Sequence, residues 1–119
     1  MRRKSTRSHG EDAVNNYLLE HNINFVREMA WVECRSDKDK LLRFDFYLPD
    51  LNIVIEYQGQ HHYKPINKYR RAANVHRRIV INDQVKRDFC NKFNIRLIEI
   101  CYLDFKNIST ILDELIPHE

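Results

Sequence analysis

The chain has 119 residues, of which 43% are hydrophobic and 31% charged, and a formal net charge of +3, so we expect one folded domain. No apolar run is long enough to cross a membrane and no signal peptide is evident, so we expect a cytoplasmic protein. Cys34, Cys90 and Cys101 are odd in number and irregularly spaced, which favours buried free thiols over disulfides or a zinc site.

The first half of the chain reads as a basic arm, a helix and three strands. Residues 1–9 form the arm, and residues 10–119 form the domain. Helical spacing of Val14, Tyr17 and Leu18 predicts a helix over 11–23, and Ser8, three residues before Glu11, resembles a capping box. Turn residues at RSDKDK and PDLN separate the predicted strands, which cover 24–34, 41–49 and 52–59.

The second half begins with a basic stretch, 64–80, which we read as a loop with little regular structure. A helix over 82–94 follows, with Asn82 as its cap, and then a strand over 95–103 and a helix over 106–116. The order α-β-β-β-α-β-α predicts an α/β fold in which a mixed four-stranded sheet is flanked by helices.

Two acids interrupt the apolar strands in RFDFYLPDLNIVIEYQGQHHY. Strand alternation places Phe44, Phe46 and Leu48 on one face and Asp45 on the other. A hairpin closed symmetrically about Asp50–Leu51 sets Asp45 opposite Glu56, with Cβ atoms about 5 Å apart. A divalent cation such as Mg²⁺ compensates two like charges so placed. The alternative is a pair of surface acids that bind Arg43 and Arg96.

The residues after Glu56 add groups that suit phosphodiester hydrolysis. Gln58 shares the face of Glu56, Gly59 ends or bends the strand, and His61 and His62 can carry a proton near neutral pH. With only two glycines in the chain, each is expected where the backbone needs one. Acids, a proton carrier and nearby cations together indicate metal-assisted cleavage of a phosphodiester.

The same stretch, followed by NDQVKRDFCNKFNIRLIEI, resembles the small restriction-endonuclease-like nucleases of the PD-(D/E)xK superfamily, nearest the branch of very-short-patch repair and phage homing endonucleases. The resemblance runs from about Ser8 to Tyr102. It implies a restriction-endonuclease-like fold and DNA hydrolysis with Mg²⁺, for which Mn²⁺ can substitute. A bacterial or phage-encoded protein is then expected.

The resemblance also implies roles for individual residues. Asp45 and Glu56 match the metal ligands, joined by a backbone carbonyl near Tyr57. The lysine of the family signature falls on Gln58, which can position water but carries no charge, so Lys86 or a second metal would supply the cation. Three further groups match family positions: Glu11 at the start of the first helix, His62 as the histidine after the strand, and Asp83 or, less well, Asp88 as the helix acid.

Two acid-free basic blocks predict a polyanionic partner, double-stranded DNA above all, bound by a monomer or homodimer. The predicted DNA-binding residues are Arg2, Arg3, Lys4, Lys64, Lys68, Arg70, Arg71, Arg77 and Arg78, with Tyr63 and Tyr69 as possible stacking groups. Three alternatives stay open: a nucleic-acid-binding module of nuclease fold that does not cleave, a structure-specific nuclease for junctions or flaps, and a structural or interaction protein.

Overall fold

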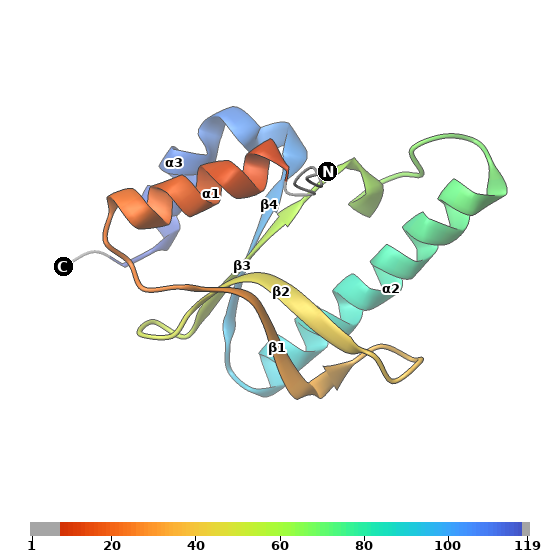
Figure 1. Ribbon diagram of the computed structural model, residues 1–119, viewed down its shortest axis with the longest axis horizontal. Coiled ribbons are helices and arrows are strands. Elements are labelled where there is room, and N and C mark those ends of the chain that lie inside the picture. The colour runs from red at the N-terminus through yellow and green to blue at the C-terminus, as the bar shows by residue number, and fades with distance from the viewer. Residues whose placement is uncertain (1–7, 118–119) are drawn as a thin grey trace, which may run out of the picture.

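The computed structural model describes residues 8–117, which form a three-layer α/β structure around a four-stranded sheet (Figure 1). The strands lie in the order β1 (Val26–Arg35), β2 (Leu41–Leu48), β3 (Ile53–Gln58) and β4 (Arg96–Cys101). The first three are antiparallel neighbours, whereas β3 and β4 run parallel. A parallel pair needs a long crossover, which α2 (Arg70–Lys92) supplies. The predicted α/β class and mixed sheet are therefore confirmed.

One face of the sheet is covered by α1 (His9–Glu20) and α3 (Ile108–Leu115), which lie side by side in Figure 1. Their apolar stripes bury Val14 and Leu18 of α1 and Leu112 of α3 against the inward side chains of the sheet. Two short 3₁₀ segments complete the chain: η1 (Gln60–His62) after β3, and η2 (Tyr102–Asn107) between β4 and α3.

The opposite face is covered by α2, whose Phe89 and Cys90 pack with Val54 of β3 and Phe44 of β2. Neighbouring residues of β3 thus face opposite layers, Ile53 and Ile55 toward α1 and α3, and Val54 toward α2, as the alternation of a strand requires. Cys34 and Cys90 are buried free thiols, as predicted, and Cys101 is a half-buried one.

The predicted alternation of β2 is wrong at Phe44. Phe46 and Leu48 lie in the α1 and α3 layer, but Phe44 lies in the α2 layer, where its ring is 6.0 Å from that of Phe89. The two phenylalanines on either side of Asp45 therefore serve opposite cores. At the same level of the neighbouring strand the ladder is irregular, since Glu28 has a φ of 55° between the pairs Arg27–Phe46 and Met29–Phe44.

The loop predicted over 64–80 is wrong from Arg70 onward. Helix α2 begins there and has 23 residues, so Asn82, the predicted cap, lies in the middle of the helix. The N-terminus of α2 carries no side-chain cap. Its first turns contain four arginines, which obscure the helical spacing of the apolar residues. Ala72, Val75, Ile79, Asp83 and Lys86 follow the spacing of a helix face, and this pattern was the available signal.

The predicted Ser8 cap of the first helix is confirmed, with its hydroxyl accepting a hydrogen bond from the Glu11 N–H at 3.1 Å. The predicted bounds of 11–23 are shifted, because the helix spans His9–Glu20 and so includes residue 9 of the predicted arm. Gly10 is required for space, because a Cβ there would lie 2.0 Å from the Tyr57 ring. The expectation that the backbone needs glycine at position 59 is wrong: Gly59 has a φ of −71°, and a Cβ there would meet nothing within 4 Å.

Candidate active site

A cavity of about 350 Å³ lies where β2 and β3 meet the start of α1, η1 and α2. The segments come from distant parts of the sequence, yet six of the seven predicted catalytic and metal-binding residues line this cavity together: Glu11, Asp45, Glu56, Tyr57, His62 and Lys86. His61, the other predicted proton carrier, lines it too. The fold thus gathers most of the predicted site in one place.

The two acids of the strand pair face each other as predicted. The pairs Phe46–Ile55, Tyr47–Val54 and Leu48–Ile53 fix the register, which sets Asp45 opposite Glu56. Each carboxylate replaces a carbonyl of the β-ladder: Glu56 Oε2 accepts the Asp45 N–H at 2.7 Å, and Asp45 Oδ2 accepts the Tyr57 N–H at 2.8 Å. The backbone therefore holds both side chains against each other.

The arrangement concentrates negative charge in a poorly solvated place. Glu56 is 5% exposed and Asp45 is half-buried. Burial and then the nearby Glu56 carboxylate raise the pKa of Asp45 to about 8, and Glu11 adds to the rise. The Tyr57 N–H and the Lys86 ammonium work in the opposite direction. The site is thus short of positive charge.

Lys86 provides the cation nearest the two acids. Its Nζ lies 2.7 Å from Glu56 Oε1, and both side chains are largely buried. Its ammonium also lies over the Phe44 ring, with Nζ 5.1 Å from the ring centroid. Glu56 therefore pairs with a lysine of α2. The alternative of surface acids bound to Arg43 and Arg96 is wrong for Glu56, which is buried.

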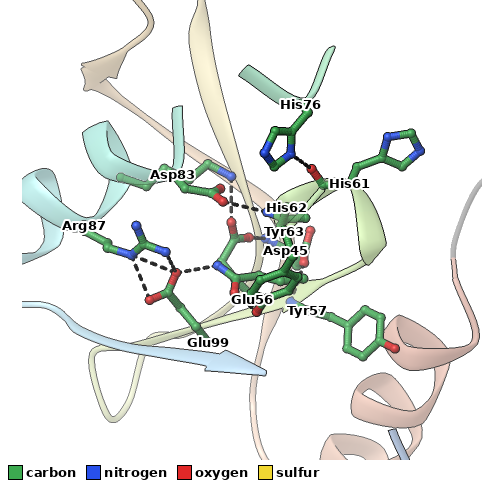
Figure 2. A network of polar contacts seen from close by, with 12 residues as sticks. Asp45, Glu56, Tyr57, His61, His62, Tyr63, His76, Asp83, Arg87 and Glu99 are labelled. Carbon is green, nitrogen blue, oxygen red and sulfur yellow. Dashed lines mark hydrogen bonds and ion pairs between the residues drawn. The ribbon is translucent and has the colours of Figure 1, made fainter. Parts of the chain in front are cut away.

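His62 reaches the cavity from η1, and Asp83 of α2 fixes its orientation (Figure 2). His62 Nδ1 lies 2.6 Å from Asp83 Oδ2, and Asp83 is 6% exposed. An ionised carboxylate only accepts hydrogen bonds, so Nδ1 carries the proton and Nε2 is left as an acceptor in the neutral ring. Asp88, the less favoured helix acid, is exposed and accepts a hydrogen bond from Gln84 instead.

Gln58 is turned away from this cavity. Its amide donates to Glu99 Oε1 at 2.5 Å and accepts from the Tyr63 hydroxyl at 2.6 Å. Arg87 in turn binds Glu99 through its guanidinium, as Figure 2 shows. Both ends of the Gln58 amide are thus occupied by a network that joins β3, β4 and α2, and the residue supports the sheet beside the site.

Glu11 lines the cavity at the start of α1 and is held by Arg27. Arg27 donates to Glu11 Oε1 at 3.0 Å and, through Nε, to the Asp45 carbonyl at 3.2 Å. Burial raises the pKa of Glu11, while Arg27 opposes the rise. The sequence gave no signal for Arg27, which ties α1 to the strand that carries Asp45.

His76 is a second residue that sequence reasoning missed. Its Nδ1 lies 2.6 Å from the His61 carbonyl, so it fastens η1, and His62 with it, to α2 (Figure 2). No sequence pattern pointed to it, because its partner is a backbone atom of another element.

The predicted DNA-binding residues fall in two groups. Arg2, Arg3 and Lys4 lie outside the described residues. Lys64 and Lys68 are exposed on the loop before α2, and Arg70, Arg71, Arg77 and Arg78 lie on the first half of α2. Tyr63 and Tyr69 are both exposed, and the Tyr63 ring lies 5.8 Å from that of Tyr102.

Two carboxylates form the candidate metal donor set. Within residues 8–117, no group of three or more His, Cys, Asp or Glu side chains is placed to hold a metal ion. Mg²⁺ is commonly held by only one or two carboxylates together with water and phosphate oxygens. The hard oxygens of Asp45 and Glu56, in a site short of positive charge, fit that donor set.

Two viral proteins resemble this chain. "Uncharacterized protein 307L" of Invertebrate iridescent virus 6 is 38% identical over 71 residues, which are 60% of this chain and 36% of that protein. "Uncharacterized protein 094L" of Frog virus 3 (isolate Goorha) is 34% identical over 67 residues, 56% of this chain and 43% of that protein. The chain spans less than half the length of these curated relatives.

No family model and no solved structure matches the chain. Both relatives are viral proteins with no assigned activity, which is consistent with a viral context, whereas the expected bacterial or phage origin stays a prediction. In the part of the chain that the structure describes, no helix is both long enough and apolar enough to cross a bilayer.

Proposed function

We propose that this protein is a metal-dependent endodeoxyribonuclease of restriction-endonuclease-like fold that hydrolyses phosphodiester bonds in DNA. One observation carries the proposal: Asp45 and Glu56 oppose each other on adjacent strands in a partly closed cavity that also holds Lys86 and His62. Burying two adjacent carboxylates is unfavourable because both lose their hydration and repel each other. Such a pair is therefore best explained by a ligand that carries positive charge.

The carboxylates of Asp45 and Glu56 and the backbone carbonyl of Tyr57 are the groups that would hold Mg²⁺ or Mn²⁺. When bound, the ion neutralises phosphate charge and makes water more acidic. Lys86 then binds the phosphoryl oxygens and stabilises the negative charge that grows in the transition state. Its position beside Glu56 supports the view that it replaces the cation missing at Gln58.

His62 moves the proton. Asp83 holds Nδ1, so Nε2 takes a proton from the attacking water or, once charged, gives one to the leaving oxygen. His76 and Asp83 together keep η1 on α2, which holds the imidazole in the cavity. Glu11, bound by Arg27, adds to the negative potential that favours a cation.

The experiment is cleavage of duplex DNA with and without Mg²⁺. We expect wild type to cut with Mg²⁺ and to stop in excess chelator, and we expect Asp45→Asn and Glu56→Gln to lose cutting while keeping their fold by circular dichroism. The matched control is Asp88→Asn, an acid-to-amide change on α2 outside the cavity, which should cut like wild type. Equal cutting by wild type and both cavity variants would sink the proposal.

A second candidate is a nucleic-acid-binding module that does not cleave. It is favoured by one observation, the engagement of Glu56 by Lys86 and of Gln58 by Glu99 and Tyr63, which leaves fewer free groups for chemistry. DNA binding that is unaffected by Mg²⁺, with no cutting of any DNA form, is the result that this candidate predicts.

A further inference from the structure

A second cavity, about 740 Å³, lies beside the first half of α2, next to the turn between β1 and β2. Of the described residues, five cations line this basic groove, and no acid does: Lys38 from the turn, and Arg70, Arg71, Arg77 and Arg78 from α2. Val75 and Ile79 line both the basic groove and the candidate active site, so the two cavities are neighbours along the same helix.

We propose that the basic groove binds the phosphodiester backbone of one DNA strand and leads that strand to the candidate active site. The path of the strand to the candidate active site rests on the function proposed above, whereas the binding of DNA in the basic groove does not. Guanidinium groups recognise phosphate by paired hydrogen bonds as well as by charge, and four of the five cations here are arginines.

The spacing of the arginines suits a run of phosphates. Residues 70, 71, 74, 77 and 78 recur at the period of a helix and therefore share one face of α2. At 1.5 Å per residue, Arg70 and Arg78 are separated by about 12 Å along the axis. One strand of duplex DNA advances about 3.4 Å per phosphate, so the face spans roughly three or four phosphates.

One of these cations, Arg78, already forms an ion pair with an acid of the same chain. Asp37, in the turn between β1 and β2, lies with Oδ1 2.5 Å from Nη1 of Arg78, and both side chains remain substantially exposed. A carboxylate and a phosphate present the same kind of oxygen to a guanidinium. Asp37 is therefore a built-in competitor that a bound strand must displace from Arg78.

The first experiment measures DNA binding by fluorescence anisotropy in chelator, so that cleavage plays no part. We compare Arg71→Gln/Arg77→Gln with Lys92→Gln/Arg96→Gln, which removes the same charge outside the groove. Each lost phosphate contact lowers the slope of log Kd against log salt by about 0.9 for duplex DNA. We expect the groove variant to lose about 1.8 in slope and the control to match wild type. Equal slopes in the two variants overturn the proposal.

The second experiment isolates Asp37. We expect Asp37→Asn to bind DNA about two- to fivefold more tightly, since an exposed ion pair of this kind is weak and its loss frees Arg78. In an Arg78→Gln background the same change should give a clearly smaller gain. An Asp37→Asn variant that binds no better than wild type, or that gains equally in both backgrounds, contradicts the competitor role.

The outcomes separate the groove from the chemistry. Binding through the groove without any cutting supports the groove as a DNA site and removes the proposed function, and with it the path of the strand to the candidate active site. Cutting that is unaffected by Arg71→Gln/Arg77→Gln supports the proposed function and removes the role of the basic groove. Tighter binding to an acidic protein such as a polyglutamate chain, or to duplex RNA of the same length, overturns the assignment of DNA as the occupant.

Discussion

At the residue scale, the main feature is a pair of carboxylates that the backbone itself holds together. Asp45 and Glu56 each accept an N–H from the facing strand, so neither can turn away to solvent without leaving a buried donor unpaired. The fold thus keeps the two carboxylates close together, and their electrostatic repulsion should affect the unfolding free energy of the protein even without a ligand.

The first prediction concerns pH. The pKa of Asp45 is raised from 3.8 to about 8 by burial and by Glu56, so between these values the folded state keeps a proton that the unfolded state releases. The contribution of Asp45 to stability is therefore present below about pH 4 and is lost as pH rises toward 8. Urea unfolding in chelator at the two ends of this window should show a larger loss for wild type than for Asp45→Asn. Identical losses would contradict the assignment.

The second prediction concerns Lys86. Replacing it with methionine leaves Glu56 buried without its cation, and we expect unfolding free energy to fall by about 3 kcal/mol. Adding Glu56→Gln to Lys86→Met should restore part of that loss, since the uncompensated charge is gone. Lys92→Met, an exposed change on the same helix, serves as the control and should have little effect. A double variant less stable than Lys86→Met would count against a charge-based explanation.

At the element scale, α2 does more than the sequence indicated. The strands, α1 and the Asp45–Glu56 register could be predicted, because apolar alternation, a serine cap and a symmetric turn are all local signals. The first turns of α2 could not, because arginines are frequent there and the stripe that packs is short and mixed, with Val75 and Ile79 beside polar groups. Tertiary contact with η1 stabilises these first turns of α2, which the local sequence pattern did not reveal.

The third prediction tests how η1 is held on α2. Asp83→Asn keeps the shape of the side chain but removes the charge that orients His62, and we expect DNA cutting to fall by about 10²-fold. Asp88→Asn is the control. Cutting that stays at the wild-type rate, or that falls only as far as the unfolding free energy of the variant falls, would contradict an orienting role for Asp83.

The fourth prediction tests the packing of α1 on β3. Gly10→Ala would bring a methyl group to 2.0 Å from the Tyr57 ring, and we expect it to cost about 1–3 kcal/mol in unfolding free energy. Gly59→Ala is a natural control, since that position has open space, and it should be almost neutral. Combining Gly10→Ala with Tyr57→Leu, which shortens the side chain, should cost less than the sum of the two single changes.

At the scale of the whole molecule, the sheet and the α2 layer meet at one aromatic group. Trp31 of β1, the single tryptophan of the chain, lies 5.5 Å from Phe44, 4.9 Å from Tyr47 and 5.3 Å from Phe89 between ring centroids. It therefore links the edge strand and the centre of the sheet to α2. The layer order was predictable from the element order, whereas this junction depends on the unforeseen position of Phe44 and was not.

The fifth prediction uses Trp31 as a reporter. Since α2 and the sheet share this cluster, we expect tryptophan emission and far-UV circular dichroism to change together in one cooperative unfolding transition. The measurement is a urea titration followed by both signals. Emission that changes at a clearly lower urea concentration would mean that α2 leaves the sheet before the rest unfolds.

The unbroken length of α2 has a mechanical consequence. Its 23 residues carry the arginines of the basic groove in the first half and Asp83 and Lys86 in the second. An unbroken α-helix of this length behaves as one rigid element, so a displacement of one end is transmitted to the other. A displacement of the N-terminal half of α2 therefore also moves Lys86 and Asp83, so that occupation of the basic groove would be felt in the candidate active site.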